Sequence, residues 1–215
     1  FPDALQHAPT LVADFFGRPE SKMITVRCFP WTFEDKVALI GDAAHAIVPS
    51  YGQGANCGFE DCSVLYGCLQ NSAGDWGRTF EEYETSRKPN ADAIADLALE
   101  HFHELRDFVG SSQFLLRKEL ERWVSGLYPD RYAPLYSLIS FTNVPYVEAM
   151  RLDREQRQLV DQLLAIPNVR ERLGSPDLQE PVDRFMARFM AEVPGFLPAS
   201  VPDRTLSRAA AAARA

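Results

Sequence analysis

The chain lacks a long apolar run, and no stretch approaches the ~18–20 residues that a membrane-spanning helix needs. It also lacks a secretion signal, because it opens at Phe1-Pro2-Asp3 with neither a basic segment nor an apolar segment after it. These absences favour a soluble, cytoplasmic protein of the bacterial type and make attachment to a membrane an unfavoured reading.

Positive charge is scarcer than negative charge, with 22 Lys and Arg against 30 Asp and Glu and a net charge of −8. Binding to nucleic-acid phosphates needs a basic patch, so nucleic acid is excluded as a partner. The four cysteines form no CxxC pair and have no histidine at a spacing suited to zinc, which predicts reduced thiols and no metal site. They are Cys28, Cys57, Cys62 and Cys68.

The most informative stretch runs from Val37 to Leu65. The apolar run 37–40 predicts a fully buried strand, which Gly41-Asp42 ends. Gly52-Gln53-Gly54 then allows a sharp bend in which the backbone can lie against a ligand. Helical spacing of apolar residues from Ala55 onward predicts a helix there. The N-terminus of such a helix presents unpaired N–H groups to a ligand edge that carries negative charge.

The combination GDAAH…P…GQG.N.G.ED within this stretch resembles the second FAD-binding motif of the class A flavoprotein monooxygenases, the aromatic hydroxylases. The resemblance implies that Asp42 binds the ribityl chain of FAD. It also implies that the amides of Ala55 and Asn56 face N1 and O2 of the flavin ring, with Gly52, Gln53 and Gly54 beside its pyrimidine edge. Pro49, Ser50 and Tyr51 would line the aromatic-ring pocket. His45 is interpreted as a packing and hydrogen-bonding residue without a catalytic role.

A flavin enzyme of this class also needs a GxGxxG motif for the ADP half of FAD, and none occurs here. We therefore expect the chain to be the C-terminal part of a longer protein and to be inactive alone. The expected fold is α/β, in which the end of a Rossmann-like FAD-binding lobe (1–75) precedes a mostly helical substrate-side region (76–166). Residues 167–215 are expected to form a Pro-rich segment and a disordered tail.

Periodicity along the rest of the chain predicts further elements. Alternation over Lys22–Cys28 predicts a half-buried strand, and apolar spacing predicts helices over 79–87 and 91–109, with Pro89 marking a kink or a fresh helix start. Further helices are predicted after Ser112 and from Pro145, with a modest helical pattern at 185–190.

The helical half resembles the C-terminal region of the kynurenine 3-monooxygenases. The segments that carry the resemblance are 97–107, 117–121, 134–136 and 141–149, and the similarity extends over roughly residues 1–164. It implies that Tyr136 binds the amino-acid end of kynurenine. His101 stands where the family has asparagine, and it is the second candidate for that contact.

The resemblance implies a reaction in which NADPH reduces FAD and O2 adds at the flavin C4a to give a hydroperoxide, which hydroxylates L-kynurenine to 3-hydroxykynurenine. Two alternatives stay open. Ser50 and His101 depart from the family pattern, which leaves a substituted kynurenine or another amino-aromatic as the substrate. A non-catalytic helical binding module with a vestigial flavin motif is the second alternative.

Overall fold

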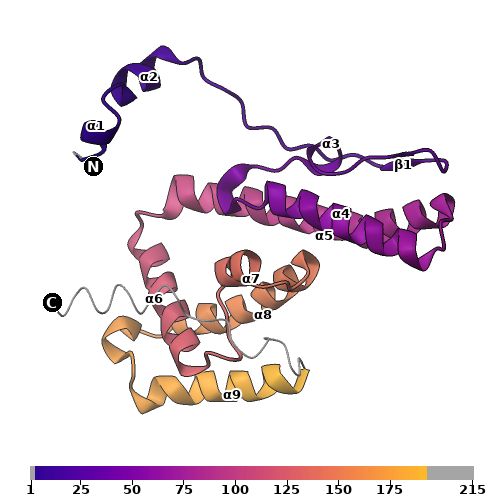
Figure 1. Cartoon of the computed structure of the whole chain (residues 1–215). Helices are drawn as coiled ribbons and strands as arrows, with labels where there is room; N and C mark the ends of the chain where they lie inside the picture. The colour runs from indigo at the N-terminus through magenta and orange to yellow at the C-terminus, as the bar shows by residue number, and fades with distance from the viewer. Residues whose placement is uncertain (1–2, 193–215) are drawn as a thin grey trace.

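The structure is a computed structural model that describes residues 3–192, and it is largely helical (Figure 1). In chain order its elements are α1 (Ala4–His7), α2 (Leu11–Gly17), β1 (Thr32–Phe33), β2 (Val37–Ala38), α3 (Asp42–His45), the 3-10 helix η1 (Pro49–Tyr51), α4 (Gly54–Asn71), α5 (Trp76–His103), the π-helix η2 (Glu104–Phe108), α6 (Ser112–Leu127), α7 (Leu135–Phe141), α8 (Tyr146–Leu164), the 3-10 helix η3 (Val169–Arg172) and α9 (Pro176–Glu192).

The only sheet in the described residues is the antiparallel pair β1–β2, which matches Thr32 with Ala38 and Phe33 with Val37. The predicted strand over 22–28 is therefore wrong, since that segment is irregular and holds a single backbone bond from Val26 N to Ala46 O. The strand predicted over 37–40 is present only at 37–38, as β2, and its predicted burial is wrong, because Val37 is 50% exposed and Ile40 is 41% exposed. The α/β expectation is confirmed only as a largely helical structure, and no Rossmann-like sheet is present in residues 3–192.

Helices α4 and α5 lie side by side as an antiparallel hairpin (Figure 1). α5 continues through Pro89 as one helix, so the predicted fresh helix start is wrong. Next to the proline, Asn90 Nδ2 donates to the Ser86 carbonyl at 3.1 Å. The carbonyl that loses its helical donor at Pro89 is that of Thr85, four residues earlier. The helical prediction on both sides of Pro89 is confirmed.

Helices α6 to α9 pack into a bundle below the hairpin (Figure 1), around a core of aliphatic side chains. Its fully buried members include Leu120, Val124, Leu138, Leu152, Leu159, Leu163, Leu178 and Met186. α9 is much longer than the modest pattern predicted at 185–190, because Leu178, Val182 and Phe185 continue the buried stripe past Pro181. The expected disordered tail lies outside the described residues.

Candidate flavin and substrate site

The turn into α3 presents the predicted ribityl ligand. Gly41 has φ +59°, a conformation that favours glycine, and Asp42 follows as the first residue of α3 with an exposed side chain. A Cβ on Gly58 would lie 3.5 Å from Gly41 Cα, so the turn and the first turns of α4 pack backbone to backbone. The carboxylate of Asp42 therefore stands at the surface beside α4.

The N-terminus of α4 is open. Gly52 adopts the left-handed conformation with φ +68°, and no side chain caps the helix. Gln53, at the N-cap position, turns its side chain inward instead, where its Oε1 accepts from Asn56 Nδ2 at 3.0 Å and from Tyr146 Oη at 3.2 Å. The amides of the first turn are thus left for a ligand, and the helix dipole favours one with negative charge. Small or exposed residues at 52, 54 and 55 leave room for a flat ring edge, so this arrangement fits a flavin.

Behind this surface, α3, α4 and α5 meet at a buried ionic network formed by His45, Asp61 and Arg87. Asp61 Oδ2 bonds His45 Nε2 at 2.5 Å and accepts from Gly41 N at 2.9 Å, while Asp61 Oδ1 accepts from Arg87 Nε at 2.8 Å. Arg87 also donates from Nη2 to the carbonyl and to the Sγ of Cys57, each at 3.3 Å. All three charged side chains are buried, which agrees with the packing role predicted for His45.

The protonation states in the network follow from its hydrogen bonds. Burial opposes a charge on His45, but the hydrogen bonds and the electrostatic attraction from Asp61 and Cys57 together outweigh it and raise the pKa of His45 to about 10. Burial likewise acts to raise the pKa of Asp61, yet the hydrogen bonds from His45 and Arg87 lower it below its ordinary value. At neutral pH the network therefore holds two cations around one buried carboxylate.

His45, Cys57 and Asp61 also bring three metal-ligand atoms within 4.8 Å of one another. Direct hydrogen bonds already join these groups, and the Arg87 guanidinium bonds two of them. A metal ion would have to displace that cation, so we assign the cluster to ion pairing.

The predicted substrate residues Tyr51, His101 and Tyr136 lie together. The Tyr51 and His101 rings stack with centroids 4.2 Å apart, and Tyr136 is 5.9 Å from Tyr51 and 6.0 Å from His101. Ser50 Oγ donates to the Ala98 carbonyl at 2.6 Å and so bonds η1 to α5. Pro49, the first residue of η1, is exposed.

His101 carries the most informative detail of this cluster. Burial lowers the pKa of His101 below its ordinary value of 6.5, so the ring is neutral at pH 7. Its Nδ1 is buried and has no hydrogen-bond partner among the described residues. A neutral imidazole with a vacant ring nitrogen can donate or accept one hydrogen bond, depending on its tautomer.

Sequence reasoning missed Arg87 and Tyr146 as parts of the site. Arg87 appears only as the last residue of a predicted amphipathic helix, and Tyr146 as one position of a resembling segment. Asp61 belongs to the ED pair of the motif, which was the one available signal for the network.

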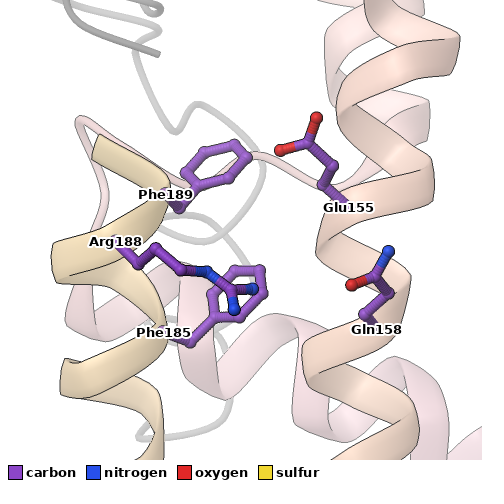
Figure 2. A pocket seen from close by; sticks show the side chains of 5 residues that line it. All are labelled: Glu155, Gln158, Phe185, Arg188 and Phe189. Carbon is purple, nitrogen blue, oxygen red and sulfur yellow. The ribbon is translucent and has the colours of Figure 1, made fainter. Parts of the chain in front are cut away.

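An open pocket lies elsewhere, between α8 and α9 (Figure 2). It is lined by Glu155, Gln158, Phe185, Arg188 and Phe189, with the Arg188 guanidinium 5.6 Å from the centre of the Phe185 ring. None of the predicted site residues lines it, so it adds nothing to the flavin or substrate site.

Comparison with known proteins bears on the same residues. Residues 5–98 match the family model described as FAD binding domain, which confirms FAD as the predicted cofactor. The chain is 45% identical over 181 residues to the kynurenine 3-monooxygenase of Flavobacterium psychrophilum, covering 84% of this chain and 40% of that protein. The chain belongs to the kynurenine 3-monooxygenase family. The family resemblance drawn from the motifs is therefore confirmed.

Two further relatives carry the same name. The kynurenine 3-monooxygenase of Myxococcus xanthus is 47% identical over 163 residues, which cover 76% of this chain and 35% of that protein. The one from Dictyostelium discoideum is 39% identical over 176 residues, covering 76% of this chain and 38% of that protein. The chain thus spans about 40% of the length of the family members that it matches. Within residues 3–192, none of the helices has both the length and the apolar character that crossing a bilayer requires.

Proposed function

We propose that the chain is the C-terminal part of an FAD-dependent, NADPH-consuming monooxygenase that hydroxylates L-kynurenine to 3-hydroxykynurenine with O2. One observation carries the proposal: the 3-10 helix η1 connects the predicted substrate residues directly to the predicted flavin-binding residues. Tyr51, its last residue, stacks on His101, and the open N-terminus of α4 begins three residues later at Gly54. A ring bound at that helix terminus would therefore lie next to the aromatic cluster.

In this proposal Asp42 holds the ribityl chain and residues 52–56 hold the pyrimidine edge of FAD. Bound FAD supplies the redox chemistry and the activation of oxygen, which side chains cannot supply. The protein contributes the amides and dipole of α4, which stabilise negative charge at the ring edge, and a fixed orientation of the substrate.

The substrate would lie against the aromatic cluster. Tyr136 is 49% exposed, so its hydroxyl is free to reach a ligand, and His101 offers its vacant Nδ1 to the carboxylate or amine of kynurenine. Pro49, Ser50 and Tyr51 would border the aromatic ring. The small side chain of Ser50, bonded to the Ala98 carbonyl, motivates the second candidate, a substituted kynurenine, because it leaves more room for a substituent than a larger residue at position 50 would.

The test uses the chain expressed together with its upstream coding sequence. NADPH oxidation is followed with and without L-kynurenine, and the product is weighed by mass spectrometry. We expect kynurenine to accelerate oxidation and the product to gain one oxygen atom. A protein that binds FAD but yields only hydrogen peroxide with kynurenine would contradict the substrate assignment, and a panel of substituted kynurenines would then test the second candidate.

The chain alone is the matched control, and we propose that it is inactive. Asp42→Ala in the extended protein provides a second control, because it removes the proposed ribityl ligand from an exposed position without disturbing the core. If Asp42→Ala binds FAD as tightly as the unaltered protein does, the flavin site is wrongly placed.

A further inference from the structure

The buried ionic network touches both segments that are proposed to hold the flavin. Asp61 binds the N–H of Gly41, and the next residue is Asp42. Arg87 binds the carbonyl and the thiol of Cys57, and the preceding residue is Asn56. The network therefore ends, on two sides, one residue away from a proposed flavin contact.

The hydrogen bonds of Asp61 leave it little freedom. Its side chain is completely buried, and its two oxygens receive bonds from three different elements: the Gly41 turn, His45 of α3 and Arg87 of α5. A buried carboxylate that loses one of several such partners is left with an uncompensated charge, so each partner is held in place by the others. The Gly41 turn cannot shift relative to α4 and α5 without breaking these bonds.

The partners also differ in what they anchor. His45 belongs to α3 itself, so its bond to Asp61 fixes the short helix that begins with Asp42. Arg87 is 1% exposed and bridges Asp61 to Cys57, so it fixes the first turn of α4 against α5. Neither side chain reaches the surface on which the flavin is proposed to lie.

We propose that Asp61, Arg87 and His45 are positioning residues for the flavin: they hold the Gly41–Asp42 turn and the first turn of α4 in the relative placement that binds the ring. This inference rests on the proposed function. It attributes the placement of the two flavin-binding segments to buried charged side chains that do not contact the flavin themselves.

The test uses the protein expressed with its upstream coding sequence and the variants Arg87→Lys and His45→Gln. Lysine keeps the charge but cannot bond Asp61 and Cys57 as a planar fork, and glutamine keeps one donor without the charge. Leu163→Ala is the control, because Leu163 is fully buried in the bundle core and lies outside the network. Unfolding by urea, the Kd for FAD from flavin fluorescence and the flavin reduction potential are measured on each.

We expect Arg87→Lys and His45→Gln to weaken FAD binding by about tenfold, the effect of roughly one lost hydrogen bond on a binding constant, and to shift the reduction potential. Leu163→Ala should lower the stability while leaving the Kd and the potential unchanged. If Arg87→Lys does not fold, His45→Gln decides the result by the same measurements.

Two results overturn the inference. The folded variants could bind FAD with the Kd and potential of the unaltered protein, which would make the network structural only. Leu163→Ala could instead produce the same loss of FAD affinity, which would make that loss a general effect of instability. Failure of the unaltered protein to bind FAD is a different outcome, because it overturns the proposed function and this inference with it.

Discussion

The cofactor-side hairpin of α4 and α5 and the C-terminal bundle differ in the charges that they bury. The bundle buries a continuous set of aliphatic side chains, among them Leu152 and Leu159, and several of its ion pairs lie at the surface. The hairpin buries apolar side chains such as Tyr83 too, but it also buries Asp61 and Arg87. Burial of apolar area therefore stabilises both regions, and the hairpin adds a buried set of paired charges.

The two regions should therefore differ in how well they tolerate amino-acid substitutions. A substitution in an apolar core lowers stability in proportion to the area and volume removed. Apolar contacts are also non-directional, so their geometry is loosely constrained. A buried charged network requires each partner at a defined angle, because a lone charge is costly and its hydrogen bonds are directional. The hairpin therefore has a more closely defined geometry, and it is more vulnerable to the loss of one group.

The largest effect is expected from Asp61→Asn. Removal of the carboxylate leaves the buried His45 and Arg87 with only the half-exposed Glu60, 2.8 Å from Arg87 Nη1, as a counter-charge, which costs about 3–5 kcal/mol of unfolding free energy. Urea denaturation measured without added flavin gives this value. Asp161→Asn is the matched control: its partner is Arg117 at 2.6 Å, its side chain is 60% exposed, and about 0–1 kcal/mol is expected. Equal losses in the two variants would remove the distinction between the regions.

Leu159→Ala probes the bundle in the same assay. Leu159 is fully buried, so its truncation leaves a cavity and is expected to cost about 2–5 kcal/mol. Because no titrating group is involved, the loss should be the same at pH 6 and at pH 9. A loss of unfolding free energy seen at only one of these pH values would show that the stability of the bundle core depends on the ionic network.

The pH dependence of stability should separate the two regions further. The pKa of His45 is raised from 6.5 to about 10 in the folded state, so its contribution is complete below pH 6.5 and is lost as the pH rises toward 10. The pKa of Asp61 is lowered from 3.8, so its contribution is present above that value and is lost as the pH falls through the folded-state pKa. We expect stability to decline between pH 7 and pH 10.

His45→Gln is the variant that checks this explanation. It removes the titrating ring, so the stability measured by urea between pH 7 and pH 10 should become nearly flat. A decline as steep as that of the unaltered protein would assign the pH dependence to other groups.

The smallest effect is expected from Tyr146→Phe, at the contact between the two regions. The substitution removes one of the two donors to Gln53 Oε1 and should cost about 1 kcal/mol of stability. It should also loosen the segment at 52–54, which limited proteolysis can detect. Tyr132→Phe, another buried tyrosine outside the flavin motif, is the control, and similar proteolysis of both variants would argue against a role for the Gln53 contact.

The helices could be predicted from the sequence because their periodicity is local. The apolar spacing along α6 and α8 predicts each helix without knowledge of its neighbours. Strands depend on partners, and the apolar run at 37–40 predicts a buried strand regardless of whether a neighbouring strand is present in the same chain. Pro89 led to the wrong prediction of a fresh helix start. A proline within a helix is costly, but here packing on both sides of it offsets that cost and α5 continues.

The candidate site likewise has one part that the sequence predicts and one part that it does not. Its flavin side is contiguous in sequence, so the motif 37–65 identifies Asp42 and the start of α4. The bond between Asp61 and Arg87 joins residues 26 positions apart on different helices, and each residue alone looks like an ordinary surface charge. Such a pairing has no signal in a single sequence.

The continuity of α5 has a mechanical consequence. At 1.5 Å per residue, the helix separates Arg87 from His101 by about 21 Å along its axis. Because no break intervenes at Pro89, a tilt of α5 at the ionic network moves the ring of His101 sideways at the other end. The helix thus acts as a spacer of fixed length, and the distance between the ionic network and His101 is set by the number of residues between them.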